Sequence, residues 1–198
     1  MRALTAEYLL RRLYPVQPGE TILVHAAAGG TGQILCQWAK ALGAVVIGTV
    51  GTDAKAEIAR AAGCAHPIVY TREHFVDEVM EITGGKGVPV VYDSVGRDTF
   101  MGSLDCLQPM GLGINFGTAS GQVEPFPMQH LHKKSLIVTR PTLATYIAER
   151  DDLEAASKEV FRVLRDGTVK VDINRRFALK DAADAHRAIE ARETTGPM

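Results

Sequence analysis

The stretch that most constrains this sequence covers residues 21–32, which read Thr-Ile-Leu-Val-His-Ala-Ala-Ala-Gly-Gly-Thr-Gly. Its apolar run at 22–24 is typical of a strand that is buried on both faces. The following residues, 33–42, carry apolar side chains at helical spacing and end before Gly43, a common helix stop. The sequence therefore predicts a strand, a glycine turn and a helix in immediate succession.

Within this stretch, Ala27, Gly29 and Gly32 occupy the three positions of a G-x-G-x-x-G dinucleotide-binding pattern, with alanine in the first place. The pattern requires a tight turn at the first position, no side chain at the second and close strand–helix packing at the third. The N–H groups at the helix start, at Gly30 and Thr31, would then face a pyrophosphate. The pattern alone leaves one alternative open, a glycine-rich loop needed only for chain geometry.

The overall composition excludes several other classes of protein. A length of 198 residues suits one domain with or without an appendage, and a formal net charge of −1 gives no general attraction to nucleic acid. No apolar run reaches the length of a membrane span, so we expect no membrane partner. The three cysteines, Cys36, Cys64 and Cys106, lack the spacing of a disulfide framework or zinc site, so we expect thiols in a reducing cytoplasm.

Strand and helix patterns alternate along most of the chain. Further strands are expected at residues 44–50, 67–70, 88–93, 111–117 and 135–139. Helices are expected at residues 2–13, 53–62, 73–82 and 98–107, and Asp53 is the expected N-cap of the second. This alternation predicts an α/β fold over residues 1–145, a Rossmann-type doubly wound parallel sheet with helices on both faces.

Residues 146–198 form a second segment with a different pattern. We expect a helix at 151–165, a strand at 169–177 and a helix at 180–192. The predicted order helix, strand, helix adds no further alternating unit to the sheet.

Several stretches of the chain resemble one known family. They are residues 4–12, 25–32, 82–87, 91–96, 103–107, 119–121 and 139–143. On these stretches the chain resembles the cofactor half of a zinc-free, zeta-crystallin-type quinone oxidoreductase of the medium-chain dehydrogenase/reductase superfamily. The resemblance implies NADP(H) as cofactor, no metal, and transfer of reducing equivalents from NADPH to a quinone or related conjugated carbonyl.

The resemblance also implies that this chain is part of a longer enzyme. Family members carry an N-terminal GroES-like catalytic domain before the leading helix and a final strand beyond the position of Met198. We therefore expect segment 146–198 to return to that catalytic domain. Two alternatives stay open: an enoyl or alkenal reductase of the same superfamily, and a non-catalytic nucleotide- or RNA-binding module. The absence of a basic excess counts against RNA.

The end of the second predicted strand bears on the choice between NAD and NADP. An NAD site usually offers an acid there, but this sequence has Gly51, and Lys55 follows four residues later with a positive charge. The resemblance places Lys55, Tyr70 and Arg192 around the 2′-phosphate of NADP. From the residues alone, the three are also explained as a solvated helix residue, a strand-end packing residue and a charge at a helix end. Asp53 is either a helix cap or a ligand of an NAD ribose.

The nicotinamide end of the site is expected where later strands end. The candidates are Ser94 and Val95 after one strand, and Phe116, Gly117 and Thr118 after the next. The resemblance adds Thr5, near the nicotinamide phosphate, and places an asparagine where this chain has Thr118. From the residues alone, Thr5 is equally an ordinary helix residue.

No catalytic constellation is visible in the sequence, so the catalytic residues are unknown at this stage. The six histidines and three cysteines do not show metal-ligand spacing. Hydride transfer to a quinone is compatible with this, because the cofactor holds the reactive bond and the protein mainly positions it.

The predicted strand at 135–139 is expected at an edge of the sheet. It is apolar and β-branched, and an uncovered edge of this kind favours pairing with a second copy of the chain. We expect a homodimer in which Leu136 and Val138 become buried, and the resemblance points the same way. The alternative is that residues 142–150, or another domain, cover the edge.

Overall fold

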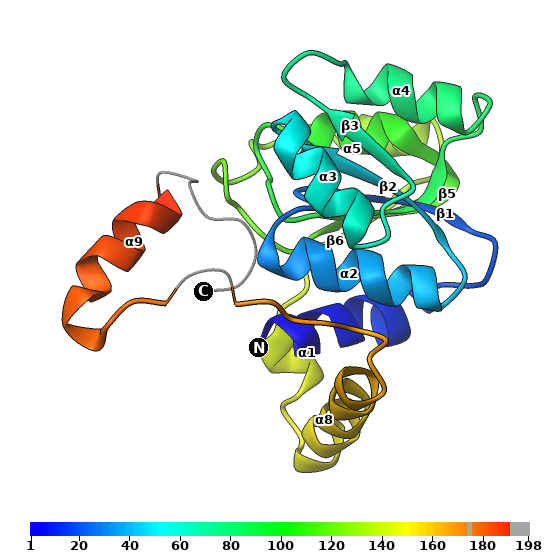
Figure 1. Ribbon diagram of the computed structural model, residues 1–198. Coiled ribbons are helices and arrows are strands. Elements are labelled where there is room, and N and C mark those ends of the chain that lie inside the picture. The colour runs from blue at the N-terminus through cyan, green and yellow to red at the C-terminus, as the bar shows by residue number, and fades with distance from the viewer. Residues whose placement is uncertain (174–175, 191–198) are drawn as a thin grey trace.

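A computed structural model describes residues 1–173 and 176–190 of the chain (Figure 1). Their strands form one parallel sheet in the order β3-β2-β1-β4-β5-β6. The strands are β1 Thr21–Val24, β2 Val45–Val50, β3 His66–Val69, β4 Val88–Asp93, β5 Leu107–Asn115 and β6 Ile137–Thr139. The predicted doubly wound parallel sheet is confirmed.

The helices alternate with these strands as the sequence predicts. They are α1 Arg2–Glu7, the π-helical turn η1 Tyr8–Leu13, α2 Gly30–Ala41, α3 Asp53–Ala61, α4 Phe75–Ile82, α5 Phe100–Cys106, α6 Gln129–His132, α7 Leu143–Tyr146, α8 Arg150–Arg165, the 3₁₀ turn η2 Leu179–Asp181 and α9 Ala182–Glu190. The short helices α6 and α7 were not expected from the sequence. None of the described helices combines the length and apolar composition needed to cross a membrane.

Both faces of the sheet are covered, which explains the continuous apolar runs in its strands. On β1, Ile22 and Val24 join one buried cluster, which includes side chains of α1, α2, α3 and α8. Leu23, between them, joins a second cluster with side chains of α4 and α5. Successive side chains of a strand point to opposite faces, so an apolar residue is required at every position.

The start of α3 differs from the prediction that Asp53 caps it. The N-cap is Thr52, whose extended backbone precedes the helix and whose hydroxyl accepts a hydrogen bond from the N–H of Lys55 at 3.2 Å. Asp53 is already the first helical residue, and its carboxylate binds Arg72 instead. Either residue type can cap a helix, and the cap is the last residue with non-helical backbone angles.

The predicted strand at 169–177 is wrong for the residues described there, which are irregular. A strand requires a neighbouring backbone ladder, but Lys170 instead finds its partners on a side chain of α2. Its N–H donates to Gln37 Oε1 at 2.8 Å, and its carbonyl accepts from Gln37 Nε2 at 3.1 Å. The helix expected at 180–192 forms as η2 and α9 up to Glu190, and Arg192 lies outside the described residues.

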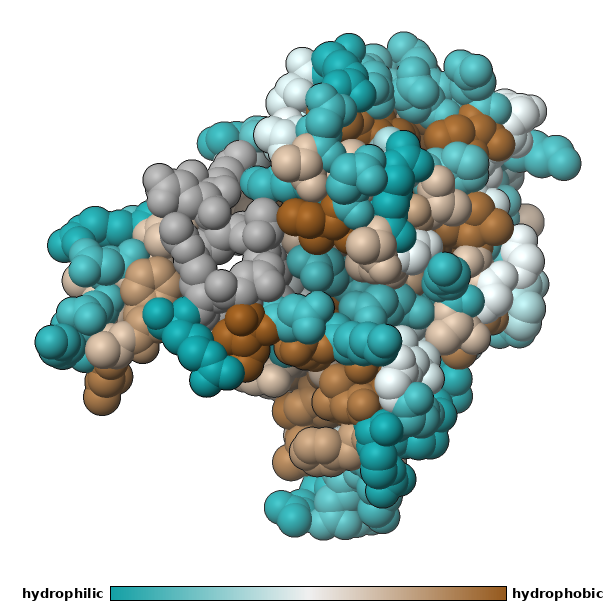
Figure 2. All heavy atoms as spheres, in the orientation of Figure 1, coloured by the Kyte–Doolittle hydropathy of each residue, from teal (hydrophilic) through white to brown (hydrophobic). Residues whose placement is uncertain are grey.

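Segment 146–198 has two parts that are placed differently. The long helix α8 packs against α1, whereas α9 stands apart from the sheet in Figure 1. Figure 2 shows brown apolar surface in the lower part of the same view, where α1 and α8 lie. The division of the chain near residue 145 stays a prediction.

The strand order places a crevice at the carboxyl ends of the central strands. The chain runs outward from β1 through β2 to β3, and then returns to the other side of β1 to begin β4, β5 and β6. The connections of β1 and β4 therefore leave in opposite directions at their carboxyl ends. In open parallel sheets, ligands bind at such a switch point.

Candidate functional site

The glycine turn after β1 forms the corner predicted from the sequence, with one shift in detail. The residue with left-handed backbone is Ala26, at φ 53°, one position before the expected turn residue Ala27. The carbonyl of Ala26 accepts a hydrogen bond from the N–H of Gly29 at 2.9 Å, and α2 begins at the next residue. Ala27 is buried, and its N–H donates to the carbonyl of Thr49 on β2. The turn is therefore fastened to the neighbouring strand.

The two later glycines of the pattern serve different purposes. A Cβ atom on Gly32 would lie 2.3 Å from the carbonyl oxygen of Ala26 and 2.8 Å from Ala27 Cα, so only glycine fits between strand turn and helix. A Cβ atom on Gly29 would lie 3.1 Å from the same oxygen, which is tight but much less severe. Gly29 instead lines an open cleft, so its missing side chain leaves the backbone accessible to a ligand.

This cleft has a volume of about 550 Å³ and lies over the carboxyl ends of β1, β2 and β4. Five of the predicted site residues line it: Gly29, Gly51, Lys55, Tyr70 and Val95. The remaining predicted residues of the described part do not line it: Thr5, Ala27, Gly30, Thr31, Gly32, Ser94, Phe116, Gly117 and Thr118. The cleft thus joins the glycine turn to the predicted phosphate-selecting residues.

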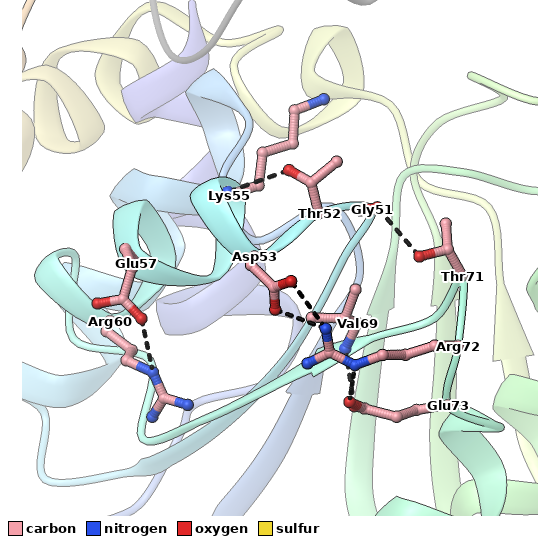
Figure 3. Close-up of polar contacts among 10 residues, drawn as sticks. All are labelled: Gly51, Thr52, Asp53, Lys55, Glu57, Arg60, Val69, Thr71, Arg72 and Glu73. Atoms are coloured by element: carbon pink, nitrogen blue, oxygen red, sulfur yellow. Dashed lines mark hydrogen bonds and ion pairs between the residues drawn. The ribbon is translucent and has the colours of Figure 1, made fainter.

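At one end of the cleft, Gly51 and Tyr70 lie against each other. A Cβ atom on Gly51 would come within 3.0 Å of the Tyr70 hydroxyl, and Thr71 donates a hydrogen bond to the Gly51 carbonyl at 3.2 Å. Tyr70 is 48% exposed, so its ring is open to a ligand. Lys55 begins from the first turn of α3, and Figure 3 shows its side chain extending away from the Asp53–Arg72 contact.

The two loops expected at the nicotinamide end pack together. A Cβ atom on Gly117 would lie 2.5 Å from the carbonyl oxygen of Ser94, so the close approach requires glycine at 117. Phe116 donates its N–H to the carbonyl of Asp93 at 2.8 Å. Thr5 lies on α1, where its hydroxyl donates to the carbonyl of Met1.

A buried polar network beneath the cleft was not predicted from the sequence. His25 Nδ1 lies 2.8 Å from the Thr49 hydroxyl, and His25 Nε2 lies 2.9 Å from the Ser103 hydroxyl. Asp93 Oδ2 accepts a hydrogen bond from Thr99 at 2.8 Å and lies 3.3 Å from the Ser103 oxygen. Burial lowers the pKa of His25, although the Asp93 charge acts in the opposite direction. His25 follows β1 directly, and Asp93 is the last residue of β4. Polar residues at the ends of two predicted strands are the sequence signal that could have indicated this network.

The described residues offer no metal site. Among them, no three or more His, Cys, Asp and Glu side chains are grouped so that they could hold a metal ion. Cys36, Cys64 and Cys106 are buried and free.

The doubly wound parallel sheet and its glycine turn define a dinucleotide-binding domain of the Rossmann type. A family model described as zinc-binding dehydrogenase matches residues 30–162. The chain belongs to this family.

Several curated relatives are similar over nearly the whole chain. The chain is 53% identical to a quinone oxidoreductase of Salmonella typhimurium, over 99% of the chain and 61% of the relative. It is 46% identical to a 2-haloacrylate reductase of a Burkholderia species, over 100% of the chain and 60% of that protein. The chain thus spans about three-fifths of the length of these relatives. The resemblance to quinone oxidoreductases is confirmed.

Solved structures agree with this relationship. The crystal structure of Escherichia coli quinone oxidoreductase complexed with NADPH matches with a TM-score of 0.96 and 52% identity, over 98% of this chain and 61% of that one. The parallel sheet and glycine corner described above therefore belong to a known cofactor-binding architecture. The residues of this chain also fit NADPH, because Gly29 lines the cleft without a side chain and Gly32 allows the backbone of the turn to contact the helix.

Proposed function

We propose that the chain is the NADP(H)-binding part of a zinc-independent quinone oxidoreductase. One observation carries the proposal: Gly51, Lys55 and Tyr70, which lie beside the carboxyl ends of β2 and β3, line the same cleft as Gly29. An acid at position 51 would favour an NAD ribose, whereas glycine and a nearby lysine favour a 2′-phosphate. The similarity to an enzyme whose structure contains NADPH supports the same choice.

The residues of this chain would bind and orient the cofactor. The N–H groups at the start of α2, beginning with Gly30 and Thr31, would face the diphosphate and stabilise its charge. Lys55 and Tyr70 would bind the 2′-phosphate together with Arg192, which the family resemblance adds. When bound, NADPH supplies the hydride, and the chain contributes position and exclusion of water.

The nicotinamide end belongs to the loops after β4 and β5. We place Ser94, Val95, Phe116, Gly117 and Thr118 there, with Thr5 from α1 beside them. The contact of Gly117 with the Ser94 carbonyl supports this assignment, because it brings the two loops to one place. Backbone contacts from these loops would keep the nicotinamide in a fixed orientation for transfer.

Direct titration of the purified chain with NADPH and NADH tests the proposed cofactor. We expect tighter binding of NADPH, and we expect Lys55→Glu to weaken NADPH much more than NADH, because a repelling anion replaces the cation. Lys158→Glu is the matched control, since Lys158 is exposed on α8 and does not line the cleft. Equal affinities of the wild-type chain for the two cofactors would contradict the proposal.

A conjugated carbonyl compound is the second candidate substrate class. The similarity to a 2-haloacrylate reductase favours it, because a haloacrylate carries a carbon–carbon double bond next to a carboxylate. Oxidation of NADPH by the chain, followed in the presence of a quinone or of an α,β-unsaturated acid or aldehyde, compares the two classes. A non-catalytic role predicts cofactor binding with neither activity, and a gel-shift at physiological salt tests RNA binding.

We further propose that the chain forms a homodimer through β6. This strand ends the sheet order, and Ile137 is 58% exposed on it. The expectation that pairing buries Leu136 is wrong, because Leu136 is already buried within the chain. The exposed apolar side chain and the sheet edge support pairing with a second copy.

Light scattering of two charge variants tests the dimer. Ile137→Lys should convert the dimer to a monomer, because lysine on an edge strand disfavours pairing. Phe161→Lys, which changes an equally apolar and exposed residue on α8, should leave the dimer intact. A wild-type chain that stays monomeric at high concentration contradicts the proposal.

We also propose a cytoplasmic location, which the buried free cysteines support.

A further inference from the structure

Asp53 is a carboxylate in an unfavourable place for a site that accepts NADP(H). It is the first residue of α3, two positions after Gly51 and two before Lys55. An acid close to the end of the second strand favours an unphosphorylated ribose and repels a 2′-phosphate. Asp53 and Lys55 lie in the same helical turn, so a phosphate bound at Lys55 would lie within the Debye length of about 10 Å from Asp53. Salt alone would therefore not cancel the repulsion between the phosphate and the Asp53 carboxylate. A site selective for the phosphate therefore needs another way to neutralise Asp53.

Arg72 provides this neutralisation from the loop between β3 and α4. Its Nη1 atom lies 2.7 Å from Asp53 Oδ1 and 2.8 Å from Oδ2, so it contacts both carboxylate oxygens (Figure 3). Hydrogen bonds first to Asp53 and then to Glu73 raise the pKa of Arg72. The guanidinium is therefore a permanent cation held against the Asp53 carboxylate.

The same guanidinium also binds an acid that lines the cleft. Arg72 Nε lies 2.8 Å from Glu73 Oε1, and the other Glu73 oxygen accepts the N–H of Val69 at 2.9 Å. These contacts, first that of Val69 and then that of Arg72, lower the pKa of Glu73. Glu73 lines the cleft with Lys55 and Tyr70, so Arg72 neutralises a second acid near the proposed phosphate site. With Arg72 present, the charges of this group sum to zero, because its two cations are matched by two anions. The group consists of Lys55, Arg72, Asp53 and Glu73.

We propose that Arg72 is a specificity-determining residue that makes the cleft selective for NADP(H) by neutralising Asp53. Arg72 acts through Asp53 and does not itself bind the phosphate. The side chains of Arg72 and Asp53 are 56% and 76% exposed, so their ion pair adds little to fold stability. The ion pair instead affects the local charge around a bound cofactor. This inference rests on the proposed cofactor site.

The test compares two arginine-to-glutamine variants on neighbouring segments. Arg72→Gln leaves Asp53 without its cation, so NADPH affinity should fall about fivefold, a size typical of exposed charge interactions, while NADH affinity stays within about twofold. The loss should shrink when salt is raised, because screening weakens the repulsion. Arg60→Gln is the control: it breaks the exposed pair with Glu57 at 3.5 Å, which lies further along α3 from Gly51 and Lys55 than Asp53 does (Figure 3). It should leave both affinities unchanged.

A combined variant distinguishes neutralisation from direct contact with the cofactor. If Arg72 acts through the acids that it binds, then Asp53→Asn and Glu73→Gln combined with Arg72→Gln should recover most of the lost NADPH affinity. If Arg72 binds the phosphate itself, the combined variant will stay as weak as Arg72→Gln, and the inference is overturned. Equal loss of NADH and NADPH in Arg72→Gln also overturns it, because the arginine would then only hold the loop in place.

The wild-type titration separates this inference from the proposal beneath it. A wild-type chain that binds both cofactors equally, or neither, overturns the proposed cofactor site and the role of Arg72 with it. A wild-type chain that prefers NADPH, together with an Arg72→Gln variant that keeps the full preference, overturns only the role of Arg72. The thermal midpoint of each variant, measured by circular dichroism, confirms that the comparison is made on folded protein.

Discussion

Substitution of Gly32 by alanine tests whether the corner between β1 and α2 depends on contact between backbones. The added Cβ atom would lie 2.3 Å from the Ala26 carbonyl oxygen and 2.8 Å from both Ala27 Cα and its carbonyl oxygen, whereas ordinary contacts are 3.4–4 Å. These atoms belong to backbone that is itself fixed. The Ala26 carbonyl accepts the N–H of Gly29, and the N–H of Ala27 donates to Thr49 on β2. The helix or the turn must therefore move by about 1 Å.

The size of the effect follows from two opposing terms. Overpacking of a tight site typically costs about 1–3 kcal/mol, and a contact with fixed backbone belongs to the upper part of this range. Alanine is favoured over glycine by about 1 kcal/mol within a helix, which offsets part of the cost. We expect a net loss of about 2 kcal/mol in the free energy of unfolding. For a chain of this size, the thermal midpoint should fall by about 4–8 °C.

Thermal unfolding followed by circular dichroism measures this change, and Gly30→Ala is the matched control. At Gly30 the nearest atom to an added Cβ is Arg2 Nη1 at 2.5 Å, the end of a flexible side chain that can turn away. The control should therefore melt within about 2 °C of the wild-type chain, as surface substitutions usually do. A Gly32→Ala chain that melts as the wild type does would refute the argument that these backbones must touch.

Two further predictions concern the cleft and the buried histidine. Gly29→Val should keep the fold, because Gly29 has φ −74° and ψ 168°, but its side chain should block the cleft and reduce NADPH affinity more than tenfold in titration, about 1.4 kcal/mol or more. Normal binding would refute the glycine assignment. Burial lowers the pKa of His25, so the unfolded chain takes up a proton that the folded chain excludes. Stability should therefore be full above about pH 6.5 and should be lost as the pH falls below it, by at most about 1.4 kcal/mol per pH unit. Urea unfolding of His25→Gln should show a smaller decrease, and an equal decrease would contradict this account.

The sheet was predictable because nearly every strand is buried on both sides. The run at 22–24 is apolar throughout since Ile22 and Val24 enter one core and Leu23 the other. The strand β5 was predicted only in part, since it was expected at 111–117 but begins at Leu107. Its first residues include Gln108, Pro109 and Met110, which lack an apolar pattern, and Met110 is 74% exposed. Periodicity detects a strand only where its side chains enter a core.

The site was predictable where it depends on local geometry and unpredictable where it depends on distant contacts. The glycine corner and the pair Gly51 and Lys55 follow from fixed spacings around one strand–helix unit. The contact of His25 with Ser103 joins residues 78 positions apart, and that of Asp53 with Arg72 joins residues 19 apart. The predicted strand at 169–177 failed for a related reason, because a strand pattern does not reveal whether a partner strand is present.

The buried polar network explains how the two ends of the cleft can keep a fixed distance. His25, Thr49 and Asp93 lie at the carboxyl ends of β1, β2 and β4, and Ser103 lies on α5. Asp93 Oδ1 also accepts the N–H groups of Val95 and Gly96, at 2.7 and 2.9 Å.

The network therefore begins beside the glycine turn and ends in the loop proposed to hold the nicotinamide. Buried hydrogen bonds are costly to leave unmade, so movement of one strand end relative to the others would break several partners together. A dinucleotide bound as we propose, from the end of β2 to the loop after β4, would require this constancy, because the proposed transfer would depend on the position of the nicotinamide. The sheet positions the strand ends, and the network holds them there.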